Sequence, residues 1–66
     1  MALIDDVEAL VRRRSLLTAV EIAEALFPDD PYQQRVNPTL VRLMKQGRLI
    51  RHGRGGIGDP FRYSPD

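Results

Sequence analysis

The chain has 66 residues, of which 42% are hydrophobic and 29% charged, and it carries no cysteine and a net charge of +1. At this length a protein buries only about 60% of the surface that its unfolded chain exposes, so we expect one small domain of modest stability. The composition excludes extensive disorder, disulfide bonds and thiolate metal sites, and no stretch approaches the roughly 20 apolar residues of a membrane span. These features predict a cytoplasmic binding module with no cofactor, metal or membrane contact, and they disfavour an enzyme.

Residues 2–14 are predicted to form the first helix. The apolar residues of this segment are Leu3, Ile4, Val7, Leu10 and Val11. This spacing places them in one stripe along an α-helix. Acidic residues lie near its start and Arg12–Arg14 near its end, an order that suits the helix dipole. We therefore interpret the three arginines as stabilising the helix end rather than as a phosphate clamp.

A short strand near Leu16–Leu17 and a second helix over residues 19–27 are expected next. Thr18 and Glu21 have the spacing of a capping box, in which each side chain accepts a hydrogen bond from a backbone N–H at the start of the helix. Pro28 cannot continue the helix and disfavours helical dihedral angles in the residue before it.

A third helix is predicted over residues 31–46. An aspartate followed by proline is a typical helix start, and Gly47 is a typical helix end. Between them Val36, Leu40 and Leu43 form an apolar stripe at helical spacing.

Pro38 interrupts this helix, because an interior proline removes a hydrogen bond and clashes with the preceding turn. One solution is a single helix that bends near Pro38. The other is a short turn followed by a new helix, capped by Asn37 with Pro38 as its first residue. We expect the bent helix, because Val36 is needed in the apolar stripe.

The remainder, residues 48–63, is predicted to be a β-hairpin. Residues 48–52 and 61–63 have the composition and alternation of strands, and a glycine-rich loop over residues 53–60 joins them. Residues 64–66 are expected to form a polar tail.

This order of elements resembles the winged helix-turn-helix superfamily of bacterial-type transcriptional regulators. Residues 16–26 resemble the first helix of the helix-turn-helix, and a second set of positions resembles the pattern of the recognition helix and the strand after it: Val36, Leu40, Leu43, Gly47, Leu49 and Ile50. The resemblance implies a mainly α, α+β fold for a single domain over residues 1–66, with three helices and a two-stranded wing. Two features depart from the pattern, namely the long acidic connection at 27–32 and Pro38.

Charge is distributed unevenly along the chain. Residues 1–33 carry three basic and seven acidic residues, a net charge of −4, whereas residues 34–66 carry seven basic and two acidic residues, a net charge of +5. Such segregation indicates a face that meets a polyanion, and six of the seven bases are arginines, which suit phosphate and guanine. Composition alone does not separate a nucleic acid from an acidic protein.

The resemblance implies binding to double-stranded DNA, with the third helix in the major groove and the wing on phosphate or in the minor groove. Residues placed at 100° intervals around the third helix define the face opposite its apolar stripe. On that face Gln34 suits adenine, and Arg42 or Arg35 suits guanine. Lys45 and the wing arginines suit phosphate, with Arg54 the best candidate for a narrow minor groove. The candidate DNA-binding residues are Gln34, Arg35, Thr39, Val41, Arg42, Lys45, Arg51, Arg54 and Arg62.

Two alternatives remain open. The chain could be a protein-interaction winged helix in a larger assembly, in which Pro38, Val41 and Ile57 form an apolar contact. It could instead recognise RNA or an unusual nucleic-acid shape through Asn37 and Asp59–Pro60. Because a domain of this size makes few contacts, tight specific DNA binding would require a homodimer or tandem sites.

Overall fold

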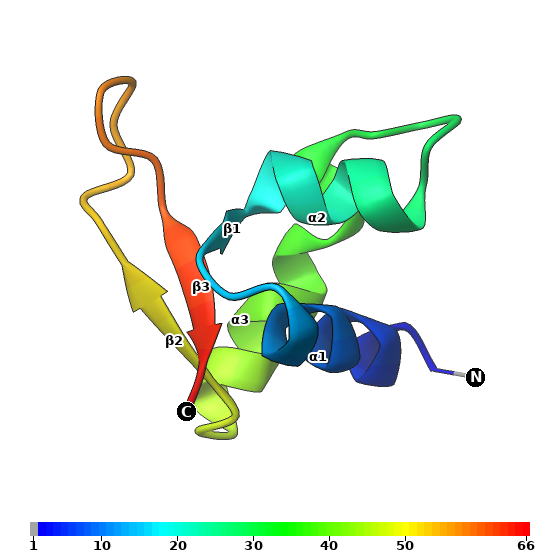
Figure 1. Cartoon of the computed structure of the whole chain (residues 1–66), viewed down its shortest axis with the longest axis horizontal. Coiled ribbons are helices and arrows are strands. Elements are labelled where there is room, and N and C mark those ends of the chain that lie inside the picture. The colour runs from blue at the N-terminus through cyan, green and yellow to red at the C-terminus, as the bar shows by residue number, and fades with distance from the viewer. Residues whose placement is uncertain (1) are drawn as a thin grey trace.

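The computed structural model describes residues 2–66, which form a mainly helical α+β fold (Figure 1). The elements in chain order are α1 (Leu3–Arg13), β1 (Leu17–Thr18), α2 (Ala19–Leu26), the 3₁₀ turn η1 (Gln33–Arg35), α3 (Asn37–Lys45), β2 (Leu49–His52) and β3 (Arg62–Pro65). The three strands form an antiparallel sheet in the order β1-β3-β2. This arrangement confirms the predicted fold class and is consistent with a winged-helix topology. Within the described residues, no helix is both long and apolar enough to cross a bilayer.

The core lies between the three helices and one face of the sheet. In the apolar stripe predicted for α1, Val7, Leu10 and Val11 are buried, whereas the first two residues, Leu3 and Ile4, are partly buried. The stripe of Val36, Leu40 and Leu43 is fully buried. The sheet closes the core with one side chain from each strand, namely Leu17, Leu49 and Tyr63. No buried polar side chain among the described residues lacks a hydrogen-bond partner.

The start of α2 confirms the predicted capping box. The Thr18 N–H donates to Glu21 Oε1 over 2.8 Å, and the Glu21 N–H donates to Thr18 Oγ1 over 3.1 Å. The short strand before it lies one residue later than predicted, at Leu17–Thr18, because Leu16 has a φ of +65° that no strand residue adopts.

The prediction of one bent helix over residues 31–46 is wrong. Residues 33–35 form the separate turn η1, and α3 begins at Asn37, which makes Pro38 its second residue. At that position the missing N–H of proline costs no helical hydrogen bond. Val36 is nevertheless fully buried, as the apolar stripe required, although it precedes the helix and its carbonyl accepts from the Leu40 N–H. The structure therefore follows the second solution, except that Asn37 is the first helical residue and not the cap.

The C-terminal hairpin extends further than residues 48–63. Strand β3 runs to Pro65, opposite Leu49, so two residues of the predicted polar tail belong to the sheet. Leu49 is buried at the start of β2, and the returning strand must run equally far to pair with it. The hairpin stands beside the helices, and its loop extends away from the sheet (Figure 1).

Candidate nucleic-acid interface

The outward side of α3 carries most of the residues predicted to contact bases. Arg42 and Lys45 are exposed, Val41 is 42% exposed, and Thr39 is half-buried. Because Asn37, Val41 and Lys45 are four residues apart, they form one row along the helix. Leu40 and Leu43 are buried and define the inner side of α3, and this row lies at one edge of the opposite, outward side.

Gln34 and Arg35 lie on η1 instead of on α3. The Arg35 guanidinium forms an ion pair with Asp30 over 2.9 Å and stacks 4.4 Å from the centre of the Phe27 ring. Arg35 therefore holds the acidic connection between α2 and η1. Its predicted role at a base would require both contacts to break.

The base of the wing is built around Phe61. Arg51 of β2 stacks over the Phe61 ring at 4.1 Å from its centre. Gly55 passes so close to the same ring that an added Cβ would clash with it, and its φ is +84°. Glycine is therefore required at this position both by backbone conformation and by space.

Asp59 orders the wing tip. Its side chain accepts from the Arg54 N–H over 3.2 Å, and its carbonyl accepts from the Gly55 N–H over 2.9 Å. The tip presents the exposed side chains of Arg54 and Ile57, and the Ile57 side chain is fully exposed.

Two further basic residues in the second half of the chain are paired with acidic residues of other elements. Arg48 donates to Glu8 of α1 through Nε over 3.0 Å and through Nη2 over 2.6 Å. These bonds lower the pKa of the Glu8 carboxyl below its ordinary value. Arg62 donates to the Leu16 carbonyl over 3.2 Å and lies 3.5 Å from Glu21. Glu21 also has a lowered pKa, chiefly because of the backbone N–H of its capping box.

Of the seven basic side chains of residues 34–66, four have no acidic partner within residues 2–66, and they are Arg42, Lys45, Arg51 and Arg54. Two lie on the outward side of α3 and two on the wing. The excess of positive charge in residues 34–66 therefore reduces to these four cations on α3 and the wing. The other basic residues without an acidic partner among the described residues are Arg13 and Arg14, at the end of α1. Sequence reasoning could not separate this group from Arg35, Arg48 and Arg62, whose partners are set by the fold.

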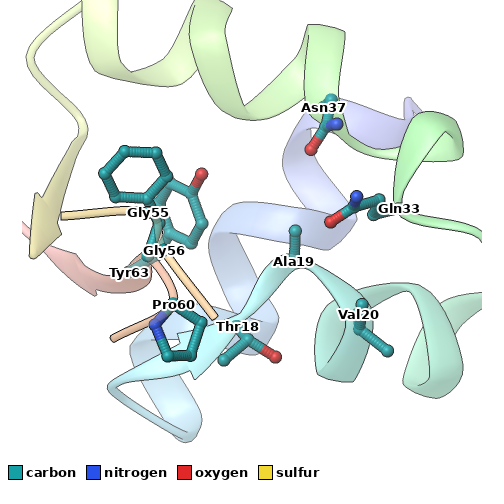
Figure 2. Close-up of a pocket in the computed structure, with 10 residues that line it drawn as sticks. Thr18, Ala19, Val20, Gln33, Asn37, Gly55, Gly56, Pro60 and Tyr63 are labelled. Atoms are coloured by element: carbon teal, nitrogen blue, oxygen red, sulfur yellow. The ribbon is translucent and has the colours of Figure 1, made fainter. Parts of the chain in front are cut away.

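A pocket of about 420 Å³ lies between the starts of α2 and α3 and the wing, and sequence reasoning did not find it. Figure 2 shows the Gln33 and Asn37 side chains next to each other on the α3 side, across from Tyr63 and the wing glycines. Tyr63 is only 4% exposed, and burial raises the pKa of its hydroxyl, an effect that the nearby Arg51 partly offsets. The lining residues are Thr18, Ala19, Val20, Gln33, Asn37, Gly55, Gly56, Pro60, Phe61 and Tyr63.

Within residues 2–66, no three histidine, aspartate or glutamate side chains lie close enough together to hold a metal ion. His52 lies on the exposed side of the hairpin, with its Nε2 2.7 Å from Ser64 Oγ. Comparison of the chain with protein-family models, with curated proteins and with solved structures finds no match.

Proposed function

We propose that the chain binds double-stranded DNA as the DNA-binding domain of a transcriptional regulator, with α3 directed to the major groove and the wing to phosphate or the minor groove. The observation that carries this proposal is the group of four cations without acidic partners, on α3 and the wing. Cations that are not neutralised within the protein are available to replace the counterions of a polyanion. A homodimer or tandem sites would supply the affinity that one small domain lacks.

The four cations divide by position. Arg42 lies on the outward side of α3 and suits guanine, whereas Lys45, at the end of the helix, suits phosphate. Arg54 is on the glycine-rich tip and can approach a phosphate or a narrow minor groove closely. Gln34, Thr39 and Val41 remain candidates for base contacts. Arg35 and Arg62 rank lower, because each would first leave an ion pair.

Paired titrations of labelled duplexes test this proposal. Wild-type affinity for a mixed-sequence duplex should fall steeply between about 50 and 200 mM salt. Arg54→Ala should weaken binding to every duplex and reduce the salt slope by about one. Arg42→Ala should cost about 1–3 kcal/mol on a selected site and little on random duplex. Arg13→Ala is the matched control, because it removes an arginine from the end of α1.

The outcome that contradicts the proposal is equally clear. If the wild type binds no duplex at about 50 mM salt, or if Arg13→Ala weakens binding as much as Arg54→Ala does, the four cations are not the binding surface.

A second candidate function rests on exposed apolar side chains of α3 and the wing. Val41 is 42% exposed and Ile57 fully exposed. They would suit a protein-interaction module, in which the cations form only a rim. For that function, Val41→Ser would abolish partner binding, and duplex DNA would not compete with the partner.

A further inference from the structure

The pocket beside α3 differs in chemistry from the surface around it. None of its ten lining residues is charged. Its walls combine apolar groups, among them Val20, Pro60 and the Tyr63 ring, with the side-chain amides of Gln33 and Asn37. Within residues 2–66, neither amide makes a hydrogen bond to another protein group.

Cations border this neutral pocket on the wing side. Arg51 stacks on Phe61, one of the lining residues, and Arg54 directly precedes Gly55, another. An occupant would therefore place a neutral, planar group inside the pocket and a negative group at its edge. A nucleotide has this distribution of charge, since its base is neutral and its phosphate anionic.

The lining also suits a base in detail. Apolar and aromatic walls favour a planar ring, and a carboxamide offers the paired donor and acceptor that match a base edge. The volume of about 420 Å³ is within the range of small-ligand sites. Figure 2 shows both amides on the same side of the pocket, where they could contact one edge of a single ring.

We propose that this pocket binds one unpaired nucleobase, with its backbone phosphates held by Arg51 and Arg54. The proposal rests on the proposed DNA-binding function and adds a preference to it. The chain should favour DNA that offers an unstacked base, such as a bulge, over a perfect duplex. The energy needed to extrude a base is smallest where the base is already unpaired.

Three labelled duplexes with the same flanking sequence test the proposal by fluorescence anisotropy: a perfect duplex, one with a single unpaired adenosine, and one with an abasic site at the same bulge. The adenosine bulge should bind on the order of tenfold more tightly than the abasic bulge, because only the base differs. In NMR spectra, the side-chain NH₂ signals of Gln33 and Asn37 should shift with the adenosine bulge and not with the abasic bulge.

Two pairs of variants localise the effect. Gly56 and Gly58 both lie in the wing loop, and a Cβ at either position would meet no atom within 4 Å, but only Gly56 lines the pocket. Gly56→Val should therefore abolish the preference for the adenosine bulge, and Gly58→Val should preserve it. Likewise Gln33→Ala should reduce the ratio of the adenosine-bulge affinity to the abasic-bulge affinity about fivefold. Gln34→Ala, one residue further along η1, should lower the affinity for all three duplexes alike and leave that ratio unchanged.

The results distinguish a failure of the pocket proposal from a failure of the proposed DNA-binding function. If all three duplexes bind equally and with a steep salt dependence, or if Gly56→Val and Gly58→Val behave alike, the base pocket is refuted and DNA binding stands. If none of the duplexes binds at about 50 mM salt, the proposed function fails and the pocket proposal with it.

Discussion

Leu43→Ala should remove a large share of the protein's stability. The Leu43 side chain is fully buried at the centre of α3, in the core shared with α1 and the sheet. Truncating a fully buried leucine lowers the free energy of unfolding by about 2–5 kcal/mol, through lost burial and the cavity left behind. At about 0.05–0.15 kcal/mol per residue, a chain of 66 residues has only about 3–10 kcal/mol in total.

Thermal and urea unfolding followed by circular dichroism measure this loss. In a domain of this size the melting temperature should fall by at least about 8 °C. Val41→Ala is the matched control on the same helix, because its side chain is exposed, and it should change the free energy of unfolding by only about 0.5 kcal/mol. A loss below about 1 kcal/mol for Leu43→Ala would refute the assignment of the core face of α3.

Three further predictions concern α3, the wing and the contact between α1 and β2. Pro38→Ala should leave the helical circular dichroism almost unchanged, because Pro38 is already in the first turn of α3, and a clear gain in helicity would contradict this boundary. Gly55→Ala should destabilise the wing, measured as faster amide exchange in β2 and β3, because the new methyl group would clash with Phe61 at a positive φ. The free energy of unfolding should fall as the pH drops below about 4.5, because hydrogen bonding by Arg48 lowers the pKa of Glu8 in the folded chain from an ordinary value of 4.5. Glu8→Gln should reduce that pH dependence, of which the lowered pKa of Glu21 leaves a part, and an unchanged profile would refute the role of Glu8.

Much of the fold could be predicted because its signals are local. The capping box at Thr18 needs only residues three apart, and the helical stripes need only a window of a few turns. The start of α3 could not be settled in this way. Val36 had to be buried, which pointed to one long helix, but a buried residue can also precede a helix, as Val36 does. The steric requirement of Pro38 decided the boundary.

The candidate site was less predictable, because it depends on contacts between distant segments. Arg48 and Glu8 are 40 residues apart, and nothing local to Arg48 separates it from the unpaired Arg42. The pocket likewise combines two amides near the start of α3 with wing glycines about twenty positions later. Each of these residues is unremarkable in the sequence, and the packing of the wing against the helices brings them together.

The central claim is that the outward side of α3 and the wing form one nucleic-acid surface. A titration of the isotope-labelled chain with a perfect DNA duplex at about 50 mM salt, followed by amide chemical shifts, tests it most directly. The account predicts the largest shifts on the exposed side of α3, around Arg42 and Lys45, and at Arg51 and Arg54 of the wing, with few on α1. Shifts concentrated on α1, or no shifts at any residue, would contradict it.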